Sequence, residues 1–495
     1  MIYAGQPARG RRFTLRDIRL IFGLVLLCFI VLVAAAGGVG LYLLMLGLVV
    51  ATLVLAWRKP IKTAIFFAAF LPVNRFVILL VFHLTGSGPL TKSFQLWKDV
   101  VMMLLLTRVI YDALFIRKAP RIKYLDLLVI FFVGLSAVYI FYQGPDDLIT
   151  RIQGFRTDAS FMLAYFIGRG LHLELRHVRS LLLALVPGSV AVAAVAAFQF
   201  AMPALSNGIL LALGYKEFIQ LQGGLGEELA VRGRALAGGV SIPRASSLLL
   251  GDLALAFFGV MLVGLAAALF FEARSERKRI LSGAFLLAMI GTLALTVTRS
   301  AIFAVAPTLV VLGVFARSMG KLVAIGGITI TLALSGLLLT GIQPRSVQEL
   351  LNPREASAVA HENAFVKSLQ IIQDAPLGHG LGTAGTIGQR YDASQSITNE
   401  SWYLQLATEM GPTGALVYLG LTCAVLITCF RTYRHLRDVW LRSVVLGMAG
   451  AAMGFLLVSN FLHAWENTVL SMLFWMFAGI AVRARDIDQQ VDAGP

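Results

Sequence analysis

The chain has 495 residues, of which 58% are hydrophobic and only 14% are charged, and its mean hydropathy is +0.81. Soluble domains contain about 45–50% apolar and about 25% charged residues, so this composition excludes an ordinary soluble protein and predicts a polytopic membrane protein. The formal charge of +16 would suggest a nucleic-acid partner in a soluble chain, but here Lys and Arg flank apolar runs, which indicates membrane topology.

Apolar runs long enough to cross a bilayer recur along nearly the whole chain. We expect an all-α fold with about fourteen (12–14) spans, of which 157–169 is the weakest because it is short enough to be tilted or re-entrant. The expected spans are 19–36, 40–57, 62–83, 99–115, 124–142, 157–169, 180–201, 247–271, 279–297, 300–316, 322–341, 413–430, 442–459 and 466–482.

The first apolar run follows a basic segment and is similar to a signal peptide. It is long for the apolar part of a signal, and the uncharged turn "GGVG" pairs it with the next run, so we expect it to remain as a membrane helix. More than half of the 42 Lys and Arg then lie in alternate turns, which predicts that both termini face the cytoplasm. The three cysteines show neither a metal-binding spacing nor a disulfide framework.

Hydrophobicity is interrupted for longest between about Gly341 and Thr413, on the side predicted to be extracytoplasmic. This break is expected to divide the chain into three parts. Residues 1–341 would hold the first eleven spans, residues 342–412 the outer loop, and residues 413–495 the last three spans and the tail. Inside the loop, "EASAVAHENAFVKSLQIIQ" has helical apolar spacing and predicts a helix on the outer membrane face. The segment "PLGHGLGTAGTIG" that follows predicts an irregular, glycine-rich turn.

Arginines on the predicted outer side are a second indication of function, because the positive-inside bias disfavours arginine there. The arginine fork suits phosphate oxygens, so a cluster near the lipid surface would fit an anionic lipid-linked substrate such as a polyprenyl pyrophosphate. Arg244 and Arg299 are the best candidates, since each enters an apolar span without an adjacent acid, and Arg156 ranks third because Asp158 could neutralise it. Of the remaining arginines on the predicted outer side, Arg151 is expected to form an ion pair with the nearby Asp146 or Asp147. Arg232 and Arg234 are expected to be loop charges.

Glycosyl transfer from a pyrophosphate donor needs a base for the acceptor hydroxyl and positive charge for the leaving group. Candidate bases are Glu400, His361 and His379, with Glu362, His463 and Glu466 as further possibilities. Each has a plainer reading: "TNES" is also a helix-capping pattern with Thr398 or Asn399 as the cap and Glu400 in the first turn, and the loop histidines could be solvated or hydrogen-bonded. Trp402 and Tyr403 could be interfacial aromatics or a platform for sugar rings.

Taken together, these segments resemble the O-antigen ligase and O-antigen polymerase superfamily (the WaaL and Wzy type). "ESWYLQLATEMGPTG" resembles the family's His-Asn-x-x-Leu helix start with its Gly-x-x-Gly tail, with Glu400 and Ser401 in place of His and Asn. "APLGHGLGTAG" resembles the upstream Pro-Leu-x-Gly-x-Gly segment. "TVTRSAIFA" and "PRASSLLLGDLALA" resemble the two arginine elements, which places Arg299 and Arg244. The likeness covers the C-terminal half and extends to the N-terminal half by hydropathy alone.

The resemblance implies a GT-C-like membrane glycosyltransferase of the bacterial inner membrane, without cofactor or metal. Arg244, Arg299 and Arg156 would bind the pyrophosphate of an undecaprenyl-pyrophosphate-linked oligosaccharide, and Glu400 would orient or deprotonate the acceptor. Trp402 and Tyr403 would contact the glycan. Glutamate in place of histidine favours a Wzy-type polymerase over a ligase that acts on lipid A–core. A flippase for the same lipid-linked sugars is the alternative of another class, for which Arg75 and Arg108 would be midplane charges.

The partners expected on this reading are the lipid bilayer, the lipid-linked oligosaccharide, and the chain-length regulator and flippase proteins of exopolysaccharide or lipopolysaccharide biosynthesis. Nucleic acid is not expected.

Overall fold

Helices make up 83% of the computed structural model, which confirms the all-α class. It describes residues 39–116, 121–142, 147–222, 231–235, 241–340, 356–391, 397 and 399–492, so the predicted span 19–36 lies outside the described residues. Within these ranges one short antiparallel hairpin, β1 (Arg232–Ala235) with β2 (Ser241–Arg244), is the whole of the sheet structure.

The long helices follow the predicted apolar runs closely. Those of the N-terminal half are α2 (Val39–Arg58), α3 (Pro60–Phe70), α4 (Asn74–Thr85), α6 (Trp97–Tyr111), α7 (Tyr124–Tyr139) and α10 (Leu175–Ala201). Those of the C-terminal half are α13 (Asp252–Glu272), α14 (Glu276–Ala294), α15 (Arg299–Phe315), α16 (Met319–Thr340), α20 (Trp402–Tyr433), α21 (Val439–Val458) and α22 (Thr468–Asp492).

Six helical segments among the described residues are long and apolar enough to cross a membrane, which indicates a membrane protein. They are Pro60–Thr85, Leu175–Ala201, Asp252–Glu272, Trp402–Tyr433, Val439–Val458 and Thr468–Gln490. The total of fourteen spans stays a prediction. The weakest predicted span, 157–169, contains no helix of spanning length, because it is divided among the end of α8 (Leu148–Asp158), a 3-10 turn and α9 (Ala164–Gly170).

Helices α13, α21 and α22 form the buried centre of the bundle. Helices α13 and α21 approach backbone to backbone, since a Cβ atom added at Gly264 would lie 2.7 Å from the Ala451 amide nitrogen. Gly447 and Gly450 make the same close approach from the other side. In lipid the hydrophobic effect does not drive helices together. Small residues at such contacts favour helix association because they let the backbones pack closely.

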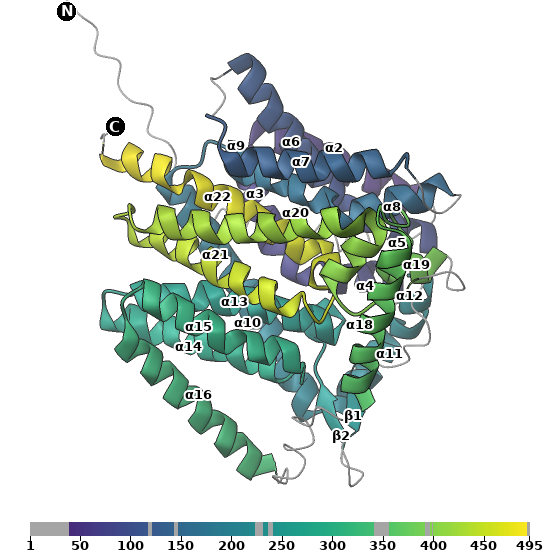
Figure 1. Ribbon diagram of the computed structural model, residues 1–495. Helices are drawn as coiled ribbons and strands as arrows, with labels where there is room; N and C mark the ends of the chain where they lie inside the picture. The colour runs from purple at the N-terminus through teal and green to yellow at the C-terminus, as the bar shows by residue number, and fades with distance from the viewer. Residues whose placement is uncertain are drawn as a thin grey trace, which may run out of the picture.

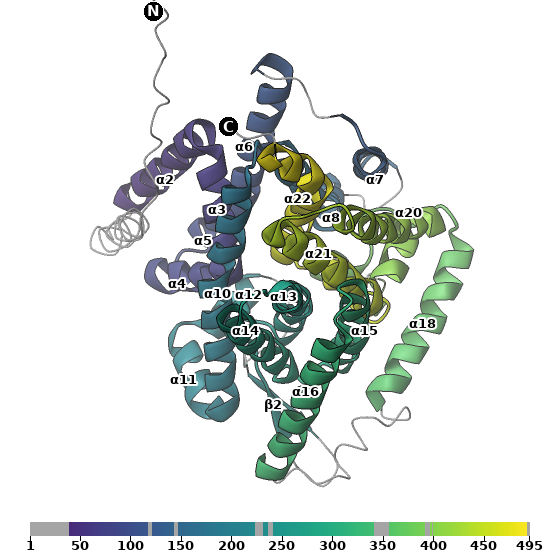
Figure 2. The ribbon, with the colours of Figure 1, turned by 90° about the vertical axis from the view of Figure 1, so that its left-hand side faces the viewer.

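The bundle has two different ends (Figure 1). Its short elements gather at one of them, which we call the hairpin end: α5 (Gly88–Gln95), α8, α11 (Pro203–Ala212), α12 (Tyr215–Leu221), α18 (Ala356–Asp374), α19 (Gly385–Tyr391) and the β1–β2 hairpin. The opposite end carries the turns α13–α14, α15–α16 and α20–α21. Helix α18 confirms the helix predicted in the long loop, and the view along the bundle shows it at the periphery, beside α20 (Figure 2).

Helix α20 begins at Trp402, eleven residues before the predicted span, and it is broken once. The break lies at Met410 and Gly411, where Gly411 has φ +69° and Pro412 follows. A side chain at Gly411 would overlap the Pro376 carbonyl oxygen, so both the backbone angle and the space require glycine. The predicted loop therefore ends in a short helical segment, and the long apolar part of α20 starts only after this break.

Candidate functional site

Arg244 lies at the hairpin end and contacts a segment that is more than fifty residues further along the chain. Its guanidinium donates to the Thr296 carbonyl at 3.0 Å and to the Thr298 hydroxyl at 3.3 Å, and it pairs with Asp252 at 2.8 Å. Thr298 is the N-cap residue of α15, whose first residue is Arg299. The structure therefore brings together the two arginine-bearing segments that the sequence singled out, at the N-terminus of a 17-residue helix.

The backbone around Arg244 is tightly fixed. The buried Gln199 side chain accepts from the amides of Ser246 and Ser247, and the Ala245 amide donates to the Leu295 carbonyl at 3.0 Å. Strain accompanies this arrangement: of the four described non-glycine residues with positive φ, three lie in these two segments, namely Ser247, Leu250 and Val297. Strained backbone of this kind concentrates at functional sites, where the surrounding structure holds it in place.

Further arginines lie close to Arg244. Arg232 is its cross-strand partner in the β1–β2 hairpin, and a guanidinium nitrogen of Arg75 lies 4.0 Å from a Cβ atom built on Gly251, the residue before Asp252. The N-terminus of α15 adds the positive end of a helix dipole. We call Arg75, Arg232, Arg244 and Arg299 the arginine cluster.

Arg156, the third predicted pyrophosphate ligand, belongs to a different group. Its guanidinium pairs with Asp99 at 2.6 Å, and Asp99 also pairs with the buried Lys98 at 3.1 Å. The expected neutraliser, Asp158, is therefore not its partner. Arg151 donates to the Tyr142 carbonyl at 3.2 Å. Of its two predicted partners, Asp146 lies outside the described residues, and Asp147 caps α8 by accepting from the Ile149 amide at 3.0 Å.

Glu400 is half-buried and comes two residues before α20. The N-cap is Ser401, whose hydroxyl accepts from the Leu404 amide, and the first turn contains no acidic residue. The capping interpretation of Glu400 is therefore wrong, because the helix begins later than that pattern requires. Asn399, beside it, is buried and contacts the His463 ring nitrogen at 2.9 Å, which fixes this segment to the turn after α21.

Glu409 is a buried acid that the sequence did not single out, although it lies within the quoted motif. Its carboxylate accepts from the Gly382 and Ala384 amides, both at 3.0 Å, and its carbonyl accepts from the Gly380 amide at 2.9 Å. The glycine-rich turn thus wraps around the break in α20, and the positive φ values of Gly378, Gly380, Gly382 and Gly385 confirm its irregular path. This turn therefore binds a carboxylate of its own chain.

Two more carboxyl groups join Glu409 in what we call the carboxyl cluster: Asp158, Glu409 and Glu466. The Gln405 side-chain amide donates to Glu466 at 3.0 Å and to Asp158 at 3.4 Å. Asp158 lies beside Glu409, and one oxygen of each carboxyl group is buried and makes no hydrogen bond with the described residues, so we infer that the pair shares a proton. Burial, together with the neighbouring Glu409 and Glu466 carboxylates, raises the pKa of Asp158 well above its ordinary value.

Replacing Glu409 separates hydrogen bonding from charge. Glu409→Ala leaves the Gly382 and Ala384 amides without an acceptor, and each such loss costs about 1–3 kcal/mol. Glu409→Gln keeps that acceptor and can donate to Asp158, so we expect it to melt close to the wild type while Glu409→Ala melts markedly lower. Thermal unfolding of the purified protein in detergent measures both. Equal losses in the two variants would contradict the shared-proton arrangement.

The raised pKa of Asp158 also predicts a pH dependence of stability. The folded state holds this proton more tightly than the unfolded state, whose carboxyl titrates at about 3.9. The contribution of Asp158 to stability is therefore complete below that pH and is lost as the pH rises through the folded-state pKa. In Glu409→Gln the amide donor stabilises ionised Asp158, so the decline in melting temperature with pH should be shallower than in the wild type. An identical decline would place its origin elsewhere in the chain.

The remaining predicted site residues lie apart from the arginine cluster. The His379 amide donates to the Thr408 carbonyl at 2.8 Å, and its buried Nε2 has no partner among the described residues. His361 is in α18, and its side chain lies outside the description. Trp402 is fully buried and packs edge-on against Tyr418 with ring centroids 5.6 Å apart, so it is a core residue and offers no face to a sugar. Tyr403 is partly buried against the same core.

Within the described ranges, no group of three or more His, Cys, Asp or Glu side chains is placed to hold a metal ion, and metal independence stays a prediction. What the hairpin end offers is therefore an arginine cluster at a helix N-terminus, an acidic residue at the start of α20, and a carboxyl cluster that fixes the glycine-rich turn. In comparisons with known proteins, the chain matches no family model and no curated protein.

Proposed function

We propose that the protein is a membrane glycosyltransferase that uses a polyprenyl-pyrophosphate-linked glycan, with its site at the hairpin end. The observation that carries this is the contact of Arg244 with Thr296 and Thr298, which joins two arginine-bearing segments at the N-terminus of α15. Arg232 lies opposite Arg244 in the β1–β2 hairpin and Arg75 lies near Gly251, so several basic side chains that suit a pyrophosphate belong to this region. On the predicted orientation, this end faces the outer side of the inner membrane.

The chemistry we propose is a single displacement at the anomeric carbon. Glu400 accepts the proton of the acceptor hydroxyl, the acceptor oxygen forms the new bond to the anomeric carbon, and the bond to the pyrophosphate oxygen breaks. The electron pair leaves with the pyrophosphate, whose charge the arginine cluster and the α15 N-terminus stabilise. Inversion at the anomeric carbon follows from a single displacement.

The acceptor we propose is a second lipid-linked repeat, as in a Wzy-type polymerase, because Glu400 stands where related ligases have histidine. Transfer to lipid A–core is the alternative, and the two differ in the acceptor and not in the site residues. A flippase is less well supported. Arg108, one of its two expected midplane charges, pairs with Asp112 at 2.8 Å near the end of α6, and the other, Arg75, is part of the arginine cluster at the hairpin end.

Reconstitution of the full chain with a lipid-linked repeat unit tests this proposal. Longer lipid-linked glycans, separated by gel electrophoresis, are the expected product. Products attached to added lipid A–core would indicate a ligase instead. Movement of the repeat unit across the bilayer without new glycosidic bonds would overturn the assignment to a glycosyltransferase.

A further inference from the structure

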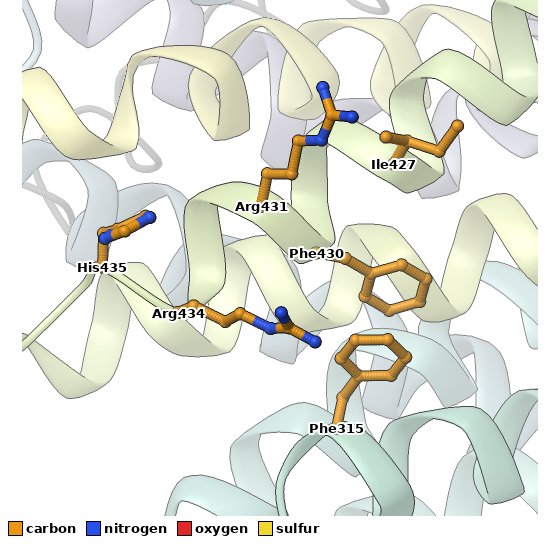
Figure 3. Close-up of a pocket in the computed structure, with 6 residues that line it drawn as sticks. All are labelled: Phe315, Ile427, Phe430, Arg431, Arg434 and His435. Atoms are coloured by element: carbon orange, nitrogen blue, oxygen red, sulfur yellow. The ribbon is translucent and has the colours of Figure 1, made fainter.

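Two neighbouring hollows lie along one side of α20 near the opposite end of the bundle, far from the site proposed above. The first holds about 270 Å³ and is lined by Phe315, Ile427, Phe430, Arg431, Arg434 and His435 (Figure 3). The second holds about 260 Å³ and is lined by Tyr124, Gly420, Cys423, Ala424, Ile427 and Arg431. Each is several times the roughly 30 Å³ that one water molecule occupies, so each has room for an apolar chain segment.

The two hollows share Ile427 and Arg431, so Ile427 forms a ridge with one hollow on either side. The far wall of the first is Phe315 of α15, whose ring stacks on Phe430 with an interplanar angle of 7°. The far wall of the second is Tyr124 at the start of α7, whose hydroxyl donates to the Ala424 carbonyl at 3.3 Å. These aromatic contacts fix both walls relative to α20.

The basic side chains of the first hollow are exposed at the end of α20, and Figure 3 shows the Arg434 guanidinium extending toward the two stacked rings. The residues that line the two hollows include no acidic side chain. Within the described part of the chain, the side chains of Arg431, Arg434 and His435 make no hydrogen bond or ion pair. Other arginines near this end are paired, such as Arg442 with Glu272 at 2.7 Å.

We infer that these hollows bind one anionic phospholipid of the leaflet at this end, with its phosphate at Arg431 and Arg434 and its two acyl chains on either side of Ile427. An apolar ridge between two hollows matches two chains that leave one headgroup. Basic residues at the membrane surface favour anionic headgroups by about 1 kcal/mol each. On the predicted orientation this is the cytoplasmic leaflet, in which anionic lipids supply such headgroups.

Native mass spectrometry of the full chain in detergent, with phosphatidylglycerol or phosphatidylcholine added, tests this inference. We expect phosphatidylglycerol to be retained in preference, and the Arg431→Gln/Arg434→Gln variant to lose about thirtyfold in retention. The matched control is Arg274→Gln/Arg277→Gln, which removes the same charge from exposed positions in the α13–α14 region at the same end. An equal loss in this control would show general surface attraction and overturn the site.

A second variant tests the chain-binding groove without changing charge. A Cβ atom at Gly420 would meet nothing within 4 Å, so Gly420→Leu fits the helix and fills the second hollow. We expect it to lower phosphatidylglycerol retention while its elution on gel filtration stays that of the wild type. Unchanged retention would overturn the placement of an acyl chain there. Neither result depends on the activity proposed for the hairpin end.

Discussion

An Arg299→Gln chain is expected to elongate lipid-linked glycans about 100-fold more slowly than the wild type, or not at all. Arg299 opens α15 beside the Arg244–Thr298 contact, where we place the charge that develops on the leaving pyrophosphate. Loss of one donor to a developing oxyanion costs about 10²–10³ in rate. The initial rate of polymer formation with a labelled repeat unit in proteoliposomes measures the effect.

Two variants sharpen the test. Arg299→Lys keeps the charge without the planar fork, so its rate should lie between those of the wild type and Arg299→Gln. Arg151→Gln is the matched control, since Arg151 is predicted to lie on the same outer side, donates to the Tyr142 carbonyl and has no contact with Arg244 among those observed. A wild-type rate in Arg299→Gln would remove Arg299 from the pyrophosphate site, and equal losses in both glutamine variants would point to general charge.

Glu400→Gln is expected to lower the same rate by about 10²–10⁴, the usual contribution of a general base. The competing explanation, in which Thr398 or Asn399 caps α20 and Glu400 lies in its first turn, is wrong because the N-cap is Ser401. The amide keeps the size of the side chain, so expression and melting temperature should stay close to those of the wild type. Glu400→Asp, which keeps the carboxylate but shortens its reach, should retain a measurable rate.

Glu362→Gln serves as the control for this prediction, since Glu362 is an exposed residue of α18 that the sequence also offered as a base. We expect it to be as active as the wild type. The reverse outcome, an inactive Glu362 variant and an active Glu400 variant, would transfer the role of base to α18.

Apolar runs located the long helices, because a bilayer imposes the same requirement on every span regardless of its neighbours. The helix within the loop and the glycine-rich turn were equally local features, set by apolar spacing and by glycine. The beginning of α20 was missed because Gln405, Thr408 and Glu409 lower its hydropathy, although all three are buried. Their partners come from other segments, and no local pattern shows them.

In the candidate site, too, local features could be predicted from the sequence and contacts between distant segments could not. Arg244 and Arg299 could be named from sequence, since an arginine that enters an apolar span is unusual wherever it folds. Arg156 was predicted to bind pyrophosphate, with the sequence neighbour Asp158 as a possible neutraliser. Its guanidinium instead pairs with Asp99, 57 residues away, and Asp158 lies beside Glu409. Trp402 was expected to be accessible, but the aromatic core around Tyr418 covers it. Ion pairing and burial depend on the fold, so these assignments needed the structure.

The break in α20 also constrains how the sequence can change over time. Gly411 has no room for a side chain because an added Cβ atom would overlap the Pro376 carbonyl oxygen. Gly378 has none because its added Cβ atom would lie 2.4 Å from the Glu409 carbonyl oxygen, so each of the two segments limits the side chains of the other. A substitution in either one is tolerated only with a compensating change in its partner. Residues 376–384 and 408–411 should therefore covary among related chains, even where the surrounding helices diverge freely.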